Sequence, residues 1–197
     1  MKVAGVILAA GRSSRLGRPK QLLPLGGKPL LQHALDASDT STLDEVVVVL
    51  GEHAAEIGKA LRLGRAIVVG NERYAEGQST SLHRGIEALG DRVDGALFIL
   101  GDQPDVTAAL IDAIVDRFRA TRALIVAPRF TDGTGNPILF ARAVWPELLA
   151  VTGDVGAREV VRARRADVVD VPIASPRLPD VDTWEDYRRL RGSDPTS

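Results

Sequence analysis

The stretch Val3–Lys20, with the sequence VAGVILAAGRSSRLGRPK, indicates the fold class of the whole chain. It begins with an apolar run, typical of a strand that is covered on both faces, and the run breaks at Gly11. No acidic residue precedes Asp36, although the formal net charge of the chain is -1. A buried strand that leads into a locally basic loop predicts an α/β fold with a site for a small anion at the end of the strand. The cations of the loop are Arg12, Arg15, Arg18 and Lys20.

Composition narrows the class of protein. The chain has 197 residues, of which 45% are hydrophobic and 26% charged, as in soluble globular proteins. It has no cysteine, which excludes disulfides, cysteine-based zinc sites and a thiol nucleophile and is compatible with the cytoplasmic location that we expect. The net charge near zero argues against a nucleic-acid partner, and no apolar run approaches the roughly 18 residues of a membrane span. We therefore expect neither nucleic acid nor a membrane as a partner.

Strand-like runs rich in Val, Ile and Leu alternate with helical patterns, which predicts a three-layer α/β/α fold with a mostly parallel sheet. The predicted strands are Val3–Ala9, Glu45–Leu50, Ala66–Val69, Gly95–Leu100, Ala123–Ala127 and Val168–Val171. The predicted helices are Pro29–Ala37, Ala54–Leu63, Ser79–Leu89 and Thr107–Arg119, the last with Thr107 as its N-cap. A turn, a short strand and a helix interrupted near Pro146 are predicted for residues 132–149. We expect one domain over residues 1–191 and a disordered tail over residues 192–197.

The basic loop does not match the common phosphate-binding motifs. Five residues separate Gly11 from Gly17 and Arg18-Pro19 follows, so the loop is not a Walker A sequence. The pattern Gly-x-Gly-x-x-Gly is also absent, which argues against a dinucleotide-binding dehydrogenase. Backbone N–H groups of a glycine-containing loop can still hold phosphate oxygens. The alternative is a solvated basic turn without a ligand.

A carboxylate stands at the end of a second buried strand, in GALFILGDQPDVT over residues 95–107. Asp102 follows this strand directly, and Pro104 prevents the strand from continuing. Mg²⁺ is commonly held by one or two carboxylates together with substrate phosphates, so Asp102 is a candidate metal ligand. The alternative is that Asp102 caps the next helix, but Asp105 and Thr107 are better placed for that role.

The sequence LAAGRSSRLGRPKQLLPLGGKPLL, residues 8–31, resembles the signature L-A-[AG]-G-x-x-x-R-[LM]-G-x-x-K of nucleotidyltransferases with a glycosyltransferase-A-like fold. It is most similar to the molybdenum-cofactor nucleotidyltransferases. The resemblance implies a nucleotide-diphospho-sugar transferase (Rossmann-like) architecture, with Arg15 and Lys20 holding a triphosphate. The residues implied to meet the base and ribose are Leu8, Ala9, Ala10 and Gly11. Members that transfer cytidylyl groups carry Ala-Ala-Gly here, which favours CTP over GTP.

The resemblance also implies a metal site and further nucleotide contacts. Asp102 would bind Mg²⁺ and act with Arg15 and Lys20 in catalysis, and Asp182 in PDVDTWEDY would complete the metal site. The alternative for this last segment is a helix cap formed by Asp182 or Thr183. Trp184 replaces a proline that is usual in the family. The further residues implied to contact nucleotide are Asn71, Gln78, Ser79 and Ser81, although Ser79 would serve equally as a helix cap.

An acceptor site is implied for Gly135, Asn136 and Pro137, where Asn136 replaces a common histidine. Arg158 would meet an anionic acceptor, or would simply be a solvated helix residue. No Gly-x-Ser-x-Gly elbow supports a hydrolase. The three histidines, which the spacing does not group as metal ligands, are His33, His53 and His83.

The function implied is transfer of CMP from CTP to molybdopterin, with Mg²⁺ as cofactor and release of pyrophosphate. One alternative is a guanylyltransferase, or another NTP transferase that acts on a sugar phosphate or other small phosphate acceptor. A second alternative is a non-catalytic, nucleotide-binding accessory protein that inserts cofactor into an enzyme. A molybdoenzyme or its maturation factor is an expected partner.

Overall fold

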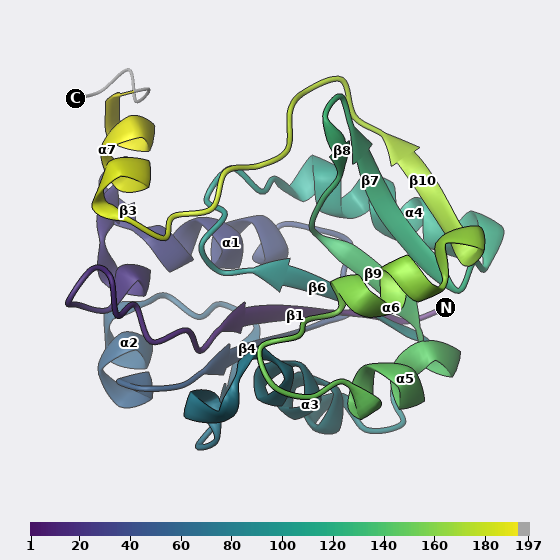
Figure 1. Ribbon diagram of the computed structural model, residues 1–197, viewed down its shortest axis with the longest axis horizontal. Coiled ribbons are helices and arrows are strands. Elements are labelled where there is room, and N and C mark those ends of the chain that lie inside the picture. The colour runs from purple at the N-terminus through teal and green to yellow at the C-terminus, as the bar shows by residue number, and fades with distance from the viewer. Residues whose placement is uncertain (193–197) are drawn as a thin grey trace.

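The computed structural model describes residues 1–192 and contains a central sheet in the order β10-β7-β9-β6-β1-β4-β5, with β8 beside β7 (Figure 1). Its strands are β1 (Val3–Ala9), β4 (Glu45–Leu50), β5 (Ala66–Gly70), β6 (Gly95–Leu100), β7 (Ile125–Phe130), β8 (Gly133–Thr134), β9 (Ile138–Ala141) and β10 (Val168–Pro172). A separate short ribbon is formed by β2 (Pro24–Leu25) and β3 (Lys28–Pro29). The α-helices are α1 (Leu30–Asp39), α2 (Ala54–Ala60), α3 (Gln78–Leu89), α4 (Ala108–Thr121), α5 (Trp145–Ala150), α6 (Arg158–Ala163) and α7 (Trp184–Gly192).

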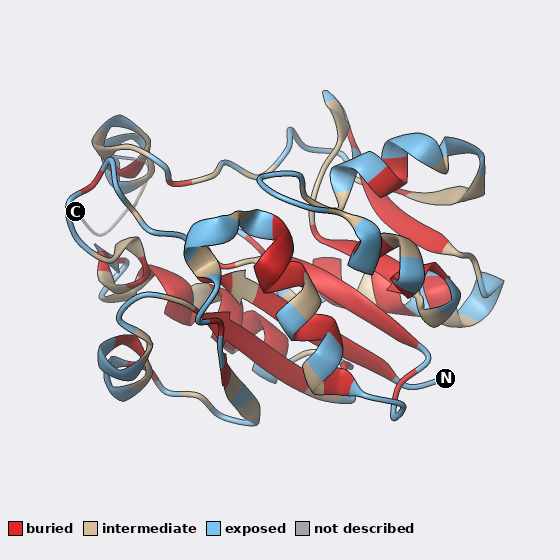
Figure 2. Ribbon diagram, turned by 60° about the horizontal axis from the view of Figure 1, so that its bottom comes forward, coloured by how far each residue is buried: buried red, intermediate tan, exposed pale blue. Residues whose placement is uncertain are grey.

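Helices cover both faces of the sheet, which confirms the predicted three layers. One apolar cluster joins α1, α2 and α4 to one face, and a second joins α3, α5 and α6 to the other. In β1 the side chain of Ile7 belongs to the first cluster and that of Val6 to the second, because neighbouring residues of a strand point to opposite faces. Figure 2 shows the buried strands between helices whose outer faces are exposed. The continuous apolar runs therefore correctly predicted strands that are buried on both faces.

The sheet is mostly parallel, with one reversal. β1 pairs in parallel with β4 and β6, whereas β9 is antiparallel to both β6 and β7. The predicted bounds of β1, β4 and β6 are confirmed, but β7 begins at Ile125 and α2 already ends at Ala60. The helical segment predicted around Pro146 consists of a 3-10 turn, η3 (Arg142–Val144), and of α5, and Pro146 lies in the first turn of α5, where its missing N–H is not needed.

Helix starts test two further predictions. Thr107 is the N-cap of α4, and its Oγ1 accepts the N–H of Leu110 at 3.2 Å. Ser79 is not a cap, because α3 begins at Gln78 and Gly77 occupies the N-cap position. Helix α7 reaches Gly192, the first residue of the predicted tail, and the rest of that tail lies outside the described residues.

The segment after β10 brings distant parts of the chain together. It runs back along one side of the molecule to α7, which lies near the β2–β3 ribbon (Figure 1). The backbone N–H of Val181 donates to the carbonyl of Asp102 at 3.1 Å on the way. A third apolar cluster, which includes Leu16, Val181 and Tyr187, fastens α7 to the loop after β1. The C-terminal residues therefore complete the edge of the sheet where β1 and β6 end.

Within residues 1–192, no helix is long and apolar enough to cross a membrane.

Candidate functional site

A cavity of about 800 Å³ opens at the ends of β1 and β6. Its floor is formed by the backbone from Leu8 to Arg12 and by Gly101-Asp102. One wall comes from η2 (Tyr74–Glu76) and the start of α3, and another from the loop before α6 and α6 itself. The cavity lies where ligands bind in open α/β sheets, beyond the carboxyl ends of the strands.

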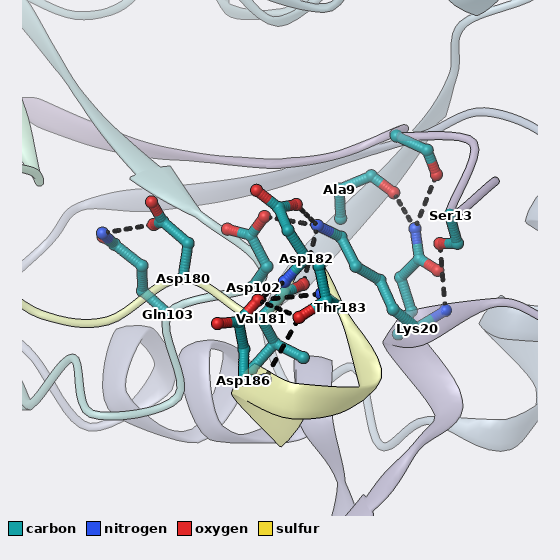
Figure 3. Close-up of polar contacts among 12 residues, drawn as sticks. Ala9, Ser13, Lys20, Asp102, Gln103, Asp180, Val181, Asp182, Thr183 and Asp186 are labelled. Atoms are coloured by element: carbon teal, nitrogen blue, oxygen red, sulfur yellow. Dashed lines mark hydrogen bonds and ion pairs between the residues drawn. The ribbon is translucent and has the colours of Figure 1, made fainter. Parts of the chain in front are cut away.

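A cluster of one cation and two carboxylates lines the cavity (Figure 3). Lys20 Nζ donates to Asp102 Oδ2 at 2.6 Å, to Asp182 Oδ1 at 2.8 Å and to the carbonyl of Val181 at 3.0 Å. Burial alone would lower the pKa of Lys20, but the charge and hydrogen bonds of Asp102 and Asp182 outweigh it and raise the pKa. Lys20 is therefore a permanent cation at neutral pH.

The loop between Gly11 and Lys20 is shaped by its own backbone. Ser13 and Gly17 have left-handed backbone conformations, with φ of 53° and 66°. The hydroxyl of Ser13 accepts the N–H of Lys20 at 3.0 Å, and the buried side chain of Leu16 anchors the loop in the third apolar cluster. Beside this anchor Arg15 is exposed and does not line the cavity, whereas Arg12 does. The loop cation that we expected to join Lys20 is thus replaced at the cavity by Arg12.

Gln21 holds the floor of the cavity in place. Its Nε2 donates to the carbonyl of Ala9 at 2.7 Å and to that of Gly11 at 3.3 Å, and the residue is 4% exposed. The amide therefore fixes the turn by which the chain leaves β1. Sequence reasoning missed this role, although Gln21 directly follows Lys20 in the signature stretch.

The start of α7 shows whether Asp182 caps this helix or faces the charged cluster. Thr183 Oγ1 accepts the N–H of Asp186 at 3.2 Å, and Asp186 Oδ2 accepts the N–H of Thr183 at 2.9 Å. This reciprocal pair is a capping box, so Thr183 caps the helix. Asp182 is not the cap, and its carboxylate points at Lys20 instead.

A third carboxylate, Asp180, lines the cavity beside this cluster. Its Oδ1 accepts a hydrogen bond from Gln103 Nε2 at 2.7 Å, and Gln103 also donates to the carbonyl of Leu178. Burial and the nearby charge of Asp102 raise the pKa of Asp180, although the bond from Gln103 opposes this. Neither Asp180 nor Gln103 was predicted to belong to the site.

Another part of the cavity lies against the ends of β1 and β4. Ala10 and Tyr74 line it, and Ser81 contributes a hydroxyl from the first turn of α3. Gly51 follows β4, where an added Cβ would lie 2.8 Å from Tyr74 Cβ and 2.7 Å from the carbonyl of Ala10. Tyr74 is therefore packed closely against the ends of β1 and β4.

The wall at α6 carries two arginines. Arg158 and Arg162 lie one helical turn apart and both line the cavity, together with Asn136. Arg162 pairs with Glu159 at 2.6 Å, whereas Arg158 has no hydrogen bond or ion pair within the described part of the chain. The loop before α6 packs tightly on α3, and Gly153 accepts the N–H of Ser79 at 3.1 Å.

The structure brings most, but not all, of the predicted site residues to one cavity. Those that line it are Leu8, Ala9, Ala10, Gly11, Lys20, Gln78, Ser81, Asp102, Asn136 and Asp182. Those that do not are Arg15, Asn71, Ser79, Gly135 and Pro137. Asn71 and Ser79 are buried below the cavity surface, and Gly135 packs against Phe130 and Arg177.

The carboxylates fit a hard divalent cation bound together with substrate phosphates. Asp102 Oδ1 is buried and has no hydrogen-bond partner, while both Asp102 and Asp182 lie within 2.8 Å of the same ammonium group. Oxygen ligands of this kind suit Mg²⁺ or Mn²⁺. No group of three or more Asp, Glu, His or Cys side chains in residues 1–192 is arranged to hold a metal ion. Two carboxylates and substrate oxygens would therefore share the coordination.

A glycine-containing basic loop that faces carboxylates across one sheet edge defines a nucleotide-binding α/β enzyme. Residues 5–168 match the family described as the MobA-like NTP transferase domain. The chain belongs to this family and is a nucleotidyltransferase, as the signature in residues 8–31 indicated.

Three comparisons illustrate the range of the similarity. The chain is 32% identical to nicotine blue oxidoreductase of Paenarthrobacter nicotinovorans, over 95% of this chain and 96% of the relative. It is 30% identical to a probable molybdenum cofactor guanylyltransferase of Thermococcus gammatolerans, over 94% of this chain and 97% of the relative. The crystal structure of Rv0371c from Mycobacterium tuberculosis superposes with a TM-score of 0.89 at 36% identity over 98% of each chain, and that protein has also been solved with manganese.

Proposed function

We propose that the protein is a Mg²⁺-dependent cytidylyltransferase that joins CMP from CTP to molybdopterin and releases pyrophosphate. The observation that carries this proposal is the convergence of Lys20, Asp102 and Asp182 in a cavity that extends on both sides of them. A cation and a carboxylate pair at one point suit a triphosphate and its metal ion. The space on either side suits a nucleoside and an acceptor.

The reaction needs positioning and neutralisation of charge more than a protein nucleophile. An oxygen of the acceptor phosphate attacks the α-phosphorus of CTP, the bond from this phosphorus to the β-phosphate oxygen breaks, and pyrophosphate leaves. Lys20 donates hydrogen bonds to phosphate oxygens, and Arg12 adds positive charge at the mouth of the cavity. Asp102 and Asp182 would hold Mg²⁺, which when bound supplies neutralisation of the phosphate charge.

The preference for CTP rests on the floor of the cavity. We assign the nucleobase to the part of the cavity at the ends of β1 and β4, which is lined by Ala10, 6% exposed, and by Tyr74. A glycine at position 10 would leave more space for a purine. Steric discrimination of this kind is worth about 1–3 kcal/mol.

The acceptor is assigned to the side of α6. Arg158 carries a guanidinium without an ion-pair partner in residues 1–192, and Asn136 adds an amide that can hydrogen bond but cannot titrate. Both suit an anionic acceptor such as the phosphate of molybdopterin. Gly135 and Pro137 support Asn136 without lining the cavity themselves.

A second candidate is transfer of another nucleotide, because the Thermococcus relative is named a guanylyltransferase. Sugar phosphates and other small phosphates are the alternative acceptors for such an enzyme. A non-catalytic accessory role, handing cofactor to a molybdoenzyme or its maturation factor, is less well supported. A protein that only carries nucleotide has no need for both metal-binding carboxylates. The relative named an oxidoreductase does not alter this ranking, since the present sequence has no Gly-x-Gly-x-x-Gly motif.

The decisive experiment measures pyrophosphate release by the purified protein with Mg²⁺ and molybdenum-loaded molybdopterin, for CTP, GTP, ATP and UTP in parallel. We expect release with CTP. Release with GTP alone would keep the transferase and overturn the base assignment. If no nucleotide gives pyrophosphate release, molybdopterin is refuted as the acceptor. A panel of sugar phosphates would then distinguish an enzyme with a different acceptor from a non-catalytic accessory protein.

The matched variants are Asp102→Ala and Asp105→Ala. Asp102→Ala removes the carboxylate beside Lys20, and we expect turnover to fall by at least about 100-fold while the protein stays folded. Asp105 is exposed and lies three residues further on, so its substitution should leave turnover unchanged. Normal turnover in Asp102→Ala would refute the assignment of the site.

A further inference from the structure

The loop before α6, residues 151–157, is fastened to the start of α3. The carbonyl of Gly153 accepts the N–H of Ser79 at 3.1 Å. A Cβ on Gly77 would lie 2.3 Å from the carbonyl carbon of Gly153 and 2.8 Å from the backbone nitrogen of Asp154, so this close approach requires glycine. The backbone of Asp154 is therefore held in place at the wall of the cavity before any ligand binds.

Asp154 has a carboxylate that the rest of the protein does not use. The residue is exposed and lines the cavity, and its side chain makes no hydrogen bond or ion pair within residues 1–192. Aspartates in turns commonly accept the backbone N–H two residues further on, but Asp154 does not. An ionised carboxylate can only accept, and its two oxygens can accept two parallel hydrogen bonds. Asp154 is therefore available to a ligand that offers two neighbouring donors.

Val155 adds an apolar surface next to this carboxylate. It is 41% exposed, and of the large hydrophobic residues that are exposed within residues 1–192 it alone lines the cavity. Sites for small molecules combine apolar contacts with a few polar groups that fix the orientation of the ligand. A planar ring suits this pair of residues, because its face can pack on Val155 while its edge donates to Asp154.

Arg158 stands on the same wall, closer to the charged cluster. Burial is the main cause that raises the pKa of Asp180, the nearby charge of Asp102 adds to the rise, and the charge of Arg158 opposes it. Arg158 therefore lies near enough to these carboxylates for its charge to reach them. The wall thus offers a cation for an anionic group near the carboxylates, and ring contacts further away, against the start of α3.

We infer that Asp154 and Val155 form a subsite for a planar heterocycle of the acceptor, which donates two adjacent N–H groups to the Asp154 carboxylate while its phosphate lies near Arg158. The inference rests on the proposed function and deepens it. The 2-amino-4-oxo edge of a pterin presents such a pair of donors, the amino group and the neighbouring ring N–H. A sugar phosphate has neither this edge nor a flat apolar face. The subsite therefore selects a pterin phosphate over a sugar phosphate.

The first test measures binding without catalysis. The probes are 6-hydroxymethylpterin phosphate and its lumazine counterpart, in which a carbonyl replaces the 2-amino group, and their fluorescence follows the titration. In the lumazine a carbonyl oxygen would face the carboxylate, so we expect the pterin to bind at least about 10-fold more tightly to the wild-type protein. Asp154→Asn offers one donor and one acceptor in place of two acceptors, so this preference should disappear. An unchanged preference in Asp154→Asn would overturn the inference.

The same titrations test the apolar contact. Val155→Thr keeps the shape of the side chain but replaces a methyl group with a hydroxyl. Both probes should bind about 3-fold more weakly and the preference for the pterin should remain, because the ring loses apolar contact while its edge keeps its partner. Leu149→Thr is the control, since Leu149 is exposed to the same degree but does not line the cavity. Wild-type binding of both probes to Val155→Thr would overturn the assigned position of the ring.

The second test uses the sign of an electrostatic effect. Removal of a negative charge from a wall that binds an anionic acceptor should strengthen binding, unless the carboxylate itself contacts the acceptor. With molybdopterin as acceptor and CTP as donor, Asp154→Asn should raise the KM for molybdopterin by roughly 10-fold and leave the KM for CTP unchanged. Glu159→Gln removes a charge from the same wall, where Glu159 pairs with Arg162, and should raise neither KM. A rise in the KM for CTP alone would place Asp154 at the nucleobase and overturn the inference.

The two tests separate this subsite from the proposed function. Binding of the pterin phosphate that depends on Asp154, without pyrophosphate release from any nucleotide, would support the subsite and refute the transfer. Pyrophosphate release with a sugar phosphate, by a protein that does not prefer the pterin to the lumazine, would support nucleotidyl transfer and overturn the subsite.

Discussion

Lys20 and Asp102 lie 82 residues apart in the sequence, and their Nζ and Oδ2 atoms are 2.6 Å apart at the edge of the sheet. Asp182, from the other end of the chain, approaches the same nitrogen at 2.8 Å. One oxygen of each carboxylate is thus held by a single ammonium group, while Asp102 Oδ1 is buried without a hydrogen-bond partner. A divalent cation would bind the same two carboxylates, so the positive charge of Lys20 opposes the cation until phosphate oxygens give Lys20 another partner.

The first prediction concerns metal affinity. Lys20→Met removes the competing charge and leaves two neighbouring carboxylates, so Mn²⁺ alone should bind more tightly, by about fivefold or more. Turnover should fall, because the triphosphate loses its cation. Titration of Mn²⁺ followed by electron paramagnetic resonance measures the first effect. Lys28→Met is the control, since Lys28 pairs with Asp36 outside the cavity at 2.6 Å. Weaker Mn²⁺ binding in Lys20→Met would contradict the competition.

The second prediction concerns the base. Ala10→Gly should raise the efficiency with GTP relative to CTP by roughly 10-fold, because the removed methyl group enlarges the part of the cavity assigned to the base. The readout is the ratio of kcat/KM for the two nucleotides. Ala4→Gly is the matched control, because Ala4 belongs to the same apolar cluster as Ala10 but does not line the cavity. An unchanged ratio in Ala10→Gly would remove Ala10 from base selection.

The sequence predicted the parts of this site that follow from strand ends. Gly11 and Asp102 terminate buried strands, and the parallel pairing of β1 with β6 brings their ends to one edge. Lys20 could be assigned because it belongs to a long signature with fixed spacing. The alternation of strands and helices predicted the layers. The antiparallel placement of β9 could not be predicted, since no local pattern distinguishes it from a parallel strand.

Other parts depend on contacts that no spacing reveals. Arg15 is exposed and does not line the cavity, beside Leu16, which is anchored in the apolar cluster with α7. Asn71 was assigned to nucleotide, but its amide is used by Arg73, Thr80 and Ser81. Asp180 enters the cavity only because the segment after β10 crosses beside Asp102. The positions of Arg15 and Asp180 depend on contacts between segments that lie far apart in the sequence. The role of Asn71 depends on the direction of its hydrogen bonds.

The third prediction concerns pH and stability. Burial and the charge of Asp102 raise the pKa of Asp180 above its ordinary value of 3.8, so its ionised form is disfavoured in the folded protein. The folded state therefore carries a cost above this raised pKa, and the cost fades as the pH falls toward 3.8 and below. Asp180→Asn retains an acceptor for Gln103 but no charge. In metal-free buffer it should be more stable than the wild type at pH 7.5.

Urea unfolding at several pH values checks this prediction. The difference in the free energy of unfolding between Asp180→Asn and the wild type should be largest near neutral pH and should shrink toward pH 4. Asp105→Asn serves as the control, because Asp105 is exposed and has no hydrogen bond in residues 1–192. A variant that is less stable than the wild type at pH 7.5 would show that the Asp180 charge has a stabilising partner.

The fourth prediction concerns Trp184, the first residue of α7. The guanidinium of Arg18 lies 5.5 Å from the centroid of a Trp184 ring, so the first residue of α7 holds the end of the basic loop. Trp184→Leu keeps an apolar side chain but removes the aromatic face, whereas Trp184→Phe retains one. Cation–π pairs at partly exposed positions contribute about 0.5–1 kcal/mol. The loop should therefore open roughly 2- to 5-fold more often in Trp184→Leu than in Trp184→Phe.

Limited proteolysis measures this opening without any nucleotide. Arg15 is followed by leucine and Arg18 by proline, so trypsin should cut the loop after Arg15 rather than after Arg18. We expect cleavage there to be faster in Trp184→Leu and close to the wild-type rate in Trp184→Phe. Arg18→Met should accelerate cleavage to the same extent, and combining it with Trp184→Leu should add little, because both changes remove one interaction. Equal cleavage in all variants would mean that the pair of Arg18 and Trp184 does not hold the loop, and that the anchor of Leu16 is sufficient.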